Sequence, residues 1–350
     1  MHASRLIQKT GKLHVVVNPP YPPLSSEELD NSFDLPYTRL PHPKYKGKRI
    51  PAYDMIKFSV NLHRGCFGGC AFCTISAHQG KFIMSRSKES ILREVEKITK
   101  MPDFRGNLSD LGGPSANMYM MGGRNEKACN ACVRPSCLHP AVCPNLNGDH
   151  RPLLNIYQAV NAIPGIKHSY IGSGVRYDML LHNWKDEALN QAAHEYTKEL
   201  ILRHVSGRLK VAPEHCSGDV LRLMGKPDFK VYEKFKDRYF ELTKSFGMEQ
   251  YLVPYLMSSH PGSKLSDAVK LAEYIKRWHY NPEQVQDYYP TPGTASTVMF
   301  YTELDPFTMK KVYVPKTAEE KRMQRALLQC ADPKNADLVR TALKMCHRED

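Results

Sequence analysis

The chain has 350 residues, and its 49 lysines and arginines outnumber its 36 aspartates and glutamates, which gives a net charge of +13. This length suits one large α/β domain with appendages, or two ordinary domains. No run approaches the roughly 18 consecutive apolar residues of a membrane span, and the N-terminus lacks the long apolar run of a signal peptide, so we expect a soluble, cytoplasmic protein without a membrane partner.

The excess of positive charge permits a polyanionic partner such as RNA. The basic residues are spread along the chain without a polybasic block, however, and an ordinary solvated surface explains that distribution more simply. The charge therefore permits an RNA partner without establishing one.

The first 50 residues are predicted to form a proline-rich, extended arm or linker. The stretch 18–51 contains many prolines and little hydrophobic periodicity. We expect at most a short helical turn near Ser25 to Leu29, with regular packing beginning after Pro51.

Residues 51–300 alternate between short apolar runs and amphipathic segments, as is typical of an α/β fold. The apolar runs predict six strands, at 55–62, 107–111, 167–173, 208–213, 251–259 and 285–290. The segments between them predict helices, and 188–205 and 265–278 have the clearest apolar faces. Such alternation implies parallel strands with right-handed crossovers, hence a sheet or an incomplete barrel whose functional residues follow the C-terminal ends of the strands.

Three cysteines occupy a glycine-rich loop directly after the first predicted strand. They are Cys66, Cys70 and Cys73 of the segment CFGGCAFC, whose glycines let the backbone curl around a bound group. Four thiolates are the usual ligands of a 4Fe-4S cluster, so three protein ligands would leave one iron open, and an open coordination position is a catalytic feature. The alternatives are packing cysteines or half of a zinc site.

The spacing CxxxCxxC, with the aromatic Phe72 before its third cysteine, resembles the defining motif of the radical S-adenosylmethionine (radical SAM) superfamily. The resemblance implies a 4Fe-4S cluster on Cys66, Cys70 and Cys73, and S-adenosylmethionine bound to the open iron through its amino and carboxylate groups. It further implies an incomplete (β/α)6 radical SAM barrel, an electron donor of the flavodoxin or ferredoxin type, and a 5′-deoxyadenosyl radical that abstracts hydrogen from a substrate.

Later segments extend this resemblance. DLGGP is similar to the motif that meets the amino group of the cofactor, which implies that role for Gly112 and Gly113. APEHCSGDVLRLMGKP resembles a segment of the methylthiotransferase and elongator-type branches, and it implies that Glu214 binds the ribose hydroxyls. Arg176 is a further candidate for cofactor binding. The alternative for both Arg176 and Glu214 is a salt bridge at the surface or in a loop.

Over nearly its whole length the chain resembles the YgiQ family, an uncharacterised group of this superfamily. The likeness rests on NPPYPPLSSEELD, HRGCFGGCAFC, HQGKFIMSRSKESILREVEKI and VAPEHCSGDVLRLMGKP. Members of that family have an additional N-terminal region that resembles a nucleotide- or cobalamin-binding α/β domain. The resemblance therefore implies that this chain is a fragment, or that a separate chain supplies the missing region.

A cysteine-rich insertion, residues 112–150, interrupts the predicted barrel. It contains a closed set of four thiols, Cys129, Cys132, Cys137 and Cys143. Structural zinc favours such a set, a second iron–sulfur cluster needs the same ligands, and the third alternative is that no metal binds. Since the insertion has almost no apolar core of its own, we expect a bound ion to hold it together. His139 and His150 are spare ligands or ordinary loop histidines.

The last segment, residues 301–350, predicts one or two charged, amphipathic helices that form a peripheral appendage. No residue in it matches the motifs described above.

The sequence thus predicts a radical SAM enzyme but leaves its substrate unknown. RNA modification is supported by the basic balance and by the likeness to methylthiotransferase segments, while a small molecule or a peptide is an equal alternative. A protein of another class would be a non-catalytic metal-binding adaptor for RNA or protein, in which both groups of thiols are structural.

Overall fold

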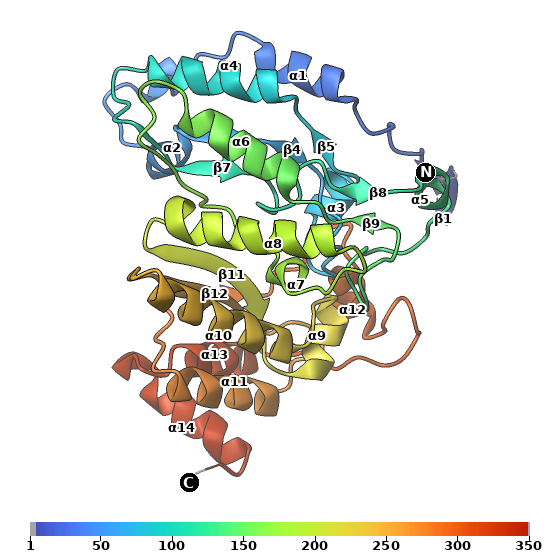
Figure 1. Ribbon diagram of the computed structural model, residues 1–350. Coiled ribbons are helices and arrows are strands. Elements are labelled where there is room, and N and C mark those ends of the chain that lie inside the picture. Colours follow the sequence, from blue (N-terminus) through green and yellow to red (C-terminus); the bar gives the residue numbers. More distant parts are fainter. Residues whose placement is uncertain (1–4, 349–350) are drawn as a thin grey trace.

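Parallel strand segments alternate with helices in the computed structural model of this chain, which describes residues 5–348 (Figure 1). The segments that form the predicted α/β unit are β3 (Ser59–Asn61), β6 (Asn107–Leu108), β7 (Asp110–Gly112), β10 (His168–Ser169), β11 (Arg208–Glu214), β12 (Tyr251–Ser258) and β13 (Gln286–Asp287). Each of the six predicted strands contains one of these segments, although most are shorter than predicted. The second predicted strand is interrupted between β6 and β7.

The strand segments pair in parallel in the order of the chain. Strand β3 pairs with β7, β6 with β10, β11 with β12, and β12 with β13. Within residues 5–348 these pairings form three separate parallel groups, β3 with β7, β6 with β10, and β11 with β12 and β13, and no closed barrel. Parallel pairing of consecutive strands agrees with the predicted crossovers.

Amphipathic helices cover these strands. They are α4 (Lys88–Thr99), α6 (Arg151–Asn161), α8 (Glu187–Glu199), α10 (Phe229–Ser245) and α11 (Leu265–Arg277). The apolar faces of α4, α6, α8 and α10 meet the strands in one core that includes Val60, Ile91, Leu111 and Tyr196. The predicted helix 188–205 is α8 followed by a π-helical turn, Leu200–His204. The predicted helix periodicity is therefore confirmed, because the residues it placed on one face are buried together.

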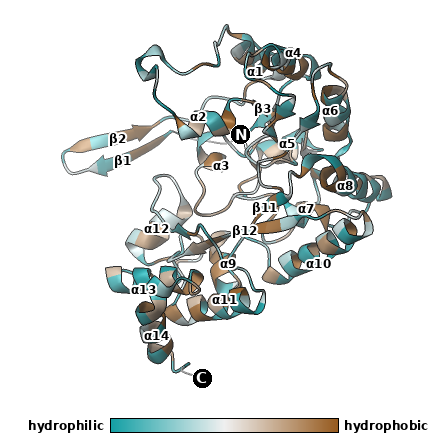
Figure 2. Cartoon of the chain, turned by 90° about the vertical axis from the view of Figure 1, so that its left-hand side faces the viewer, coloured by the Kyte–Doolittle hydropathy of each residue, from teal (hydrophilic) through white to brown (hydrophobic). Residues whose placement is uncertain are grey.

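The N-terminal arm is more ordered than the sequence predicts. Strands β1 (Leu6–Thr10) and β2 (Leu13–Val17) form an antiparallel hairpin that projects from the rest of the chain (Figure 2). A nine-residue helix, α1 (Ser26–Asp34), replaces the short turn that we expected; it begins at a capping box formed by Ser25 and Glu28. Since its Leu29 is buried and α1 lies along α4 (Figure 1), regular packing begins well before Pro51.

Two further elements complete the arm and its junction with the first strand. A 3₁₀ turn spans Pro43–Tyr45, and helix α2 spans Pro51–Ile56. Helix α2 occupies the start of the segment predicted as strand 55–62, so only Ser59–Asn61 remains extended. Residues 1–4 of the predicted arm lie outside the described residues.

The cysteine-rich insertion shares an apolar core with other segments of the chain, which the sequence did not predict. Helix α5 (Glu126–Asn130) and a two-stranded ladder, β8 (Gly122–Gly123) and β9 (Leu146–Asn147), give it regular structure. Its buried residues Met118, Met121, Leu138 and Leu146 pack against residues from other segments. These are Phe67, from the loop of the first three cysteines, and Met179, Trp184 and Leu189, which lie before or within α8. The insertion alone supplies too few apolar residues for a core, but the fold brings partners from other segments.

The C-terminal segment contains two helices, α13 (Ala318–Leu328) and α14 (Ala336–Met345), as predicted, but α13 is not peripheral. It packs on α11 and β12, and its Gln324 is fully buried, where its Nε2 donates to the carbonyl of Ser263 at 2.8 Å and its Oε1 accepts from the backbone of Ser259 at 3.0 Å. This helix therefore belongs to the packed α/β unit.

Five short elements connect these parts: β4 (His63–Arg64), β5 (Met84–Ser85), α3 (Ile75–His78), α7 (Tyr177–Leu180) and α9 (Gly218–Met224). Helix α12 (Ala295–Thr302) and a 3₁₀ turn, Pro333–Asn335, lie in the last quarter of the chain. None of the helices within residues 5–348 has the length and apolar character that crossing a membrane requires.

Candidate functional site

The thiol loop, residues 65–74, follows β3 and β4 and folds back on itself. Gly65 has a φ of +86°, a conformation that glycine adopts readily, and an added Cβ there would lie 2.0 Å from the carbonyl oxygen of Phe82. The backbone N–H of Cys73 donates to the carbonyl of Cys70 at 3.1 Å, which closes a turn between these two cysteines. The tight loop therefore depends on glycine and brings its three thiols into one neighbourhood.

Burial disfavours the thiolate form of Cys66 and Cys73 when no metal is bound. Burial raises the pKa of Cys66 to about 11, and the nearby Cys70 raises it further. Burial also raises the pKa of Cys73. A metal cluster needs thiolates, so its binding would displace protons from this loop, as is usual for thiol sites.

The predicted cofactor residue Arg176 lies beside the thiol loop. Its Nη1 donates to the sulfur of Cys70 at 3.7 Å, and its Nε donates to the carboxylate of Asp178 at 2.9 Å. Burial opposes the charges of both partners, but their mutual attraction raises the pKa of Arg176 and lowers that of Asp178. Arg176 does form a salt bridge, but the pair is buried and not at the surface, and the arginine also contacts a predicted cluster ligand.

The side chain of Asn117, which follows the predicted glycine motif, holds the backbone of Arg176. The side chain of Asn117 accepts from the N–H of Arg176 at 2.7 Å and donates to its carbonyl at 3.2 Å. Asn117 is fully buried. Neither Asn117 nor Asp178 was predicted from the sequence, since neither belongs to a motif and both contact Arg176.

Glu214 lies at the C-terminal end of β11, on the same side as the thiols. It has a φ of +67°, which is uncommon for a residue with a side chain, and its carboxylate is 3.5 Å from the ammonium of Lys226. Burial raises the pKa of Glu214, and Lys226 opposes that rise. The charges of Lys226 and Glu214 also act on the thiol of Cys73, so both residues belong to the neighbourhood of the thiol loop.

Phe72 packs behind the loop. Its ring lies edge-on to that of His260, with 5.9 Å between ring centroids, and it contacts an apolar cluster that includes Met224 and Met257. The carbonyl of its neighbour Ala71 accepts from the N–H of Ser296 at 2.9 Å, at the start of α12. Phe72 therefore anchors the loop between its second and third cysteines.

Gly112 ends β7 and Gly113 follows it, and both glycines pack against side chains other than the thiols. A Cβ on Gly113 would lie 2.5 Å from the ring of His63, and one on Gly112 would lie 2.9 Å from the hydroxyl of Ser173. His63 is fully buried, its two ring nitrogens have no hydrogen-bond partner within the described chain, and burial lowers its pKa to about 4. These glycines are thus needed for close packing, and their contact with a cofactor stays a prediction.

The four thiols of the insertion also share one neighbourhood. Burial raises the pKa of Cys137, and the other three cysteines act on it electrostatically, Cys143 most strongly. Asn145 donates to the sulfur of Cys129 at 3.2 Å, and Lys81 donates to the carbonyl of Cys132 at 3.2 Å. These electrostatic effects put the four thiols near one another, but within residues 5–348 no three such side chains converge around a single point, so a metal site in the insertion stays a prediction.

Hydrogen bonds join the insertion to the thiol loop. The N–H of Cys137 donates to the carbonyl of Phe67 at 3.0 Å, and the hydroxyl of Ser136 donates to the carbonyl of Gly68 at 2.7 Å. The two groups of cysteines are therefore adjacent in space although they lie far apart in the chain, a relation that the sequence alone does not reveal.

The two spare histidines have different surroundings. His139 lines the same cavity as Cys70 and Cys73, and burial lowers its pKa, an effect to which nearby arginines add. His150 is fully buried, its ring is 4.8 Å from that of Tyr196, and it contacts the side chain of Asn117. His150 is therefore a core residue.

A cavity of about 750 Å³, called here the thiol cavity, opens beside the loop. Cys70 and Cys73 line it, together with residues from the insertion, from α9 and from the segment 293–308. Its volume lies within the range of about 300 to 1,000 Å³ that is usual for small-molecule sites. The cavity thus gives a ligand access to two of the three predicted cluster ligands.

The chemistry of the three thiols and their surroundings indicates which kind of metal group they could hold. Among residues 5–348 no three His, Cys, Asp or Glu side chains converge as they would around a single ion. In a 4Fe-4S cluster each cysteine binds a different iron, so its ligands need not converge on one point. Three thiols on one loop, beside a cavity and beside the cation of Arg176, fit such a cluster.

The junction between the thiol loop and the insertion gives a first prediction. Gly69 has a φ of +58°, and an added Cβ would lie 2.3 Å from the carbonyl oxygen of Pro135. We expect Gly69→Ala to lower the free energy of unfolding by about 2–3 kcal/mol, since it combines backbone strain with a clash against rigid backbone. Denaturant unfolding of the purified chain measures this loss.

Gly247→Ala is the matched control. Gly247 has a similar φ of +64°, but nothing lies within 4 Å of an added Cβ, so only the backbone cost of about 1 kcal/mol is expected. Equal losses for the two variants would contradict the close contact between the loop and the insertion.

Two family models match parts of this chain, and curated proteins match nearly all of it. The Radical SAM N-terminal family matches residues 1–59, and a domain of unknown function, DUF3362, matches residues 283–350. A UPF0313 protein of Bacteroides thetaiotaomicron is 60% identical over 348 residues, which are 99% of this chain and 56% of that protein. A UPF0313 protein of Methanocella arvoryzae is 50% identical over 345 residues, 99% of this chain and 56% of that protein.

The chain therefore spans about half the length of the curated relatives that it matches. Among solved structures, the cobalamin-dependent S-adenosylmethionine radical enzyme OxsB aligns with 77% of this chain and 40% of its own, at 11% identity and a TM-score of 0.49. A likeness at that level carries no further argument.

Proposed function

The chain belongs to the radical S-adenosylmethionine superfamily and aligns with its UPF0313 relatives along 99% of its own length, and we propose that it is an enzyme that cleaves S-adenosylmethionine with a 4Fe-4S cluster. When bound, that cluster would supply one electron to the sulfonium, and the resulting 5′-deoxyadenosyl radical would abstract hydrogen from a substrate.

One observation supports this proposal most strongly. Arg176 and Glu214, which were selected from segments far from the cysteine motif, both lie beside the thiol loop, and Arg176 donates to the sulfur of Cys70 at 3.7 Å. Chance salt bridges would have no reason to gather at three thiols. This proximity supports a shared site for the cysteine motif, Arg176 and Glu214.

In this proposal the chain's own residues hold and position the reactants. Cys66, Cys70 and Cys73 would bind the cluster, and Glu214 would orient the ribose of the cofactor. Gly112 and Gly113 would allow the cofactor to approach the backbone. The task of Arg176 would be to balance the negative charge of the thiolates, since it already contacts one of them.

The proposed architecture is an incomplete (β/α)6 barrel over residues 51–300, with the insertion 112–150 and a helical segment 301–350. The parallel pairing within each group of strands supports it. The thiol loop follows β4, and Glu214 ends β11, so both lie where function is expected in such folds.

Further partners follow from the chemistry. The cluster would need a reductant of the flavodoxin or ferredoxin type. The four thiols of the insertion would hold zinc or a second iron–sulfur cluster.

The test is anaerobic reconstitution with iron and sulfide, followed by dithionite and S-adenosylmethionine. We expect 5′-deoxyadenosine to accumulate, which chromatography with mass detection would measure. If the chain holds an intact cluster and yet forms none, the enzymatic proposal fails, and the alternative of a metal-binding adaptor for RNA or protein gains support.

A further inference from the structure

The thiol cavity carries unbalanced positive charge. Three basic residues line it, Lys81, Arg134 and Arg222, and none of them forms an ion pair within residues 5–348. A cation that lines a cavity and has no carboxylate partner is available to an anionic ligand.

The contacts of these residues show how each is held. Lys81 donates to the carbonyl of Arg134 at 2.9 Å, and Arg134 donates to the carbonyl of Ala141 at 2.8 Å. Carbonyl oxygens orient these cations but leave their charge unneutralised. Arg222 is exposed on α9, and its side chain has no hydrogen-bond partner in the part of the chain that the structure describes.

One carboxylate lines the same cavity, and its oxygens are already engaged. Asp305 accepts from the N–H of Phe307 at 3.0 Å and from the hydroxyl of Thr308 at 2.8 Å. The basic side chains of the cavity therefore outnumber its carboxylates by three to one. Apolar groups complete its wall, among them Leu223 and Met299.

We propose that the thiol cavity binds a small substrate that carries a phosphate group beside an apolar portion, with Arg134 and Arg222 contacting the phosphate. This inference rests on the proposed function, because it places the substrate next to the predicted cluster. Guanidinium groups match the geometry of phosphate oxygens and retain their charge at any physiological pH.

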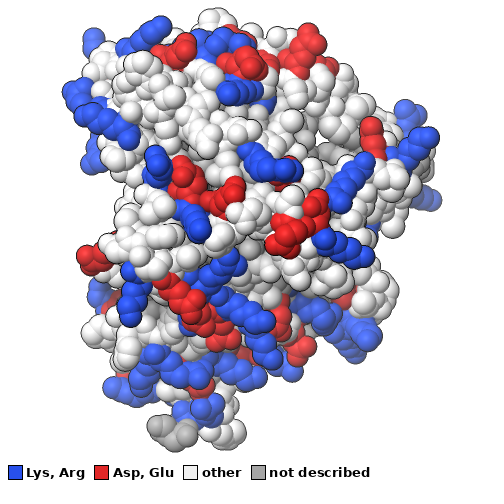
Figure 3. Space-filling model, in the orientation of Figure 1, with Lys and Arg blue, Asp and Glu red and all other residues white. Residues whose placement is uncertain are grey.

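A small phosphorylated molecule fits better than RNA. The cavity has a volume of about 750 Å³, which suits a small molecule. On the face shown in Figure 3, basic and acidic side chains are interspersed, and no continuous basic surface follows that face. An extended polyanion would need such a surface.

The test uses the full, reconstituted chain and phenyl phosphate as the probe, with heat of binding as the readout and no reductant present. We expect one molecule bound per chain, and binding weakened at least about tenfold by Arg222→Gln, since a hydrogen bond between charged groups is lost. Phenol, which lacks the phosphate, is expected to bind at least about tenfold more weakly for the same reason.

Arg340→Gln is the matched control, because Arg340 is exposed on α14 and pairs with Asp337 away from the cavity. Equal binding of phenyl phosphate by both variants, or no binding by the unchanged chain, would overturn the proposal. It would also be overturned if a single-stranded RNA oligonucleotide, and not phenyl phosphate, lost affinity in Arg222→Gln. Because binding is measured without turnover, failure to form 5′-deoxyadenosine would refute the proposed function and not this site.

Discussion

Reconstituted Cys70→Ala protein is expected to form 5′-deoxyadenosine at least about 100-fold more slowly than the unchanged chain, because losing one of three ligands leaves a cluster that cannot be held in place. Cys70 is also the thiol to which Arg176 donates, so the change removes that contact as well. The rate of 5′-deoxyadenosine formation under dithionite is the measurement.

Two controls distinguish loss of the cluster from general damage to the protein. Cys216→Ala changes a half-buried cysteine that belongs to neither group of thiols, and it is expected to leave the rate unchanged. Metal bound by the insertion should survive in Cys70→Ala, since its four thiols are untouched. Loss of all metal from that single change would contradict two separate sites.

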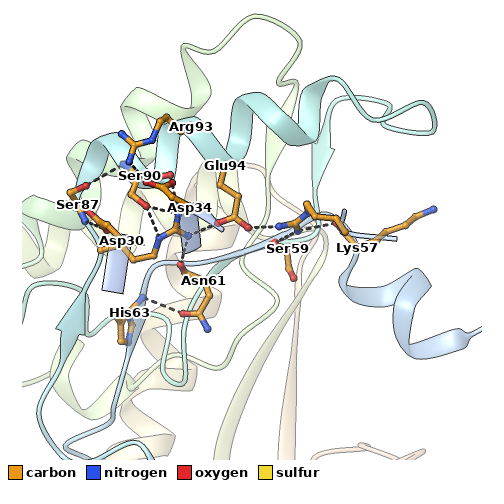
Figure 4. A network of polar contacts seen from close by, with 12 residues as sticks. Asp30, Asp34, Lys57, Ser59, Asn61, His63, Ser87, Ser90, Arg93 and Glu94 are labelled. Carbon is orange, nitrogen blue, oxygen red and sulfur yellow. Dashed lines mark hydrogen bonds and ion pairs between the residues drawn. The ribbon is translucent and has the colours of Figure 1, made fainter. Parts of the chain in front are cut away.

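Glu94→Ala is expected to lower the free energy of unfolding by about 3–5 kcal/mol, because it leaves a buried cation without its carboxylate. Arg86 is fully buried, pairs with Glu94, and donates to the carbonyl of Ser90 at 2.9 Å. Glu94 also pairs with Arg39 of the N-terminal arm. Figure 4 shows Glu94 and Ser90 on α4 within this network.

Denaturant unfolding would measure the loss, and Glu96→Ala is its matched control. Glu96 lies on the same helix with an exposed side chain, so its removal should change stability by no more than about 0.5 kcal/mol. A similar loss of unfolding free energy in both variants would contradict a special contribution of the buried ion pairs to stability.

The sequence predicts the thiol loop and its neighbours well, because their chemistry depends on residue type and order. The CxxxCxxC spacing predicts three clustered thiols, and the candidates Arg176 and Glu214 lie beside them. The sequence does not predict the apolar core of the insertion, because several residues of that core, such as Phe67 and Trp184, come from distant segments.

Other features depend on pairing that the local sequence does not determine. The sequence does not identify Lys226 as a site residue, because a lysine that follows a helix is usually solvated. Only the folded structure shows that Lys226 lies beside Glu214. The N-terminal helix α1 was underestimated for a similar reason, since Leu29 is apolar in a polar, proline-rich stretch and becomes buried against α4. Tertiary packing outweighs composition in both cases.

The most direct test of the account is the electron paramagnetic resonance spectrum of the reduced, reconstituted chain before and after S-adenosylmethionine is added. We predict the signal of a reduced 4Fe-4S cluster that changes when S-adenosylmethionine is added, because the cofactor would become the ligand of the iron that Cys66, Cys70 and Cys73 leave open. A cluster signal that is the same with and without S-adenosylmethionine would contradict the account.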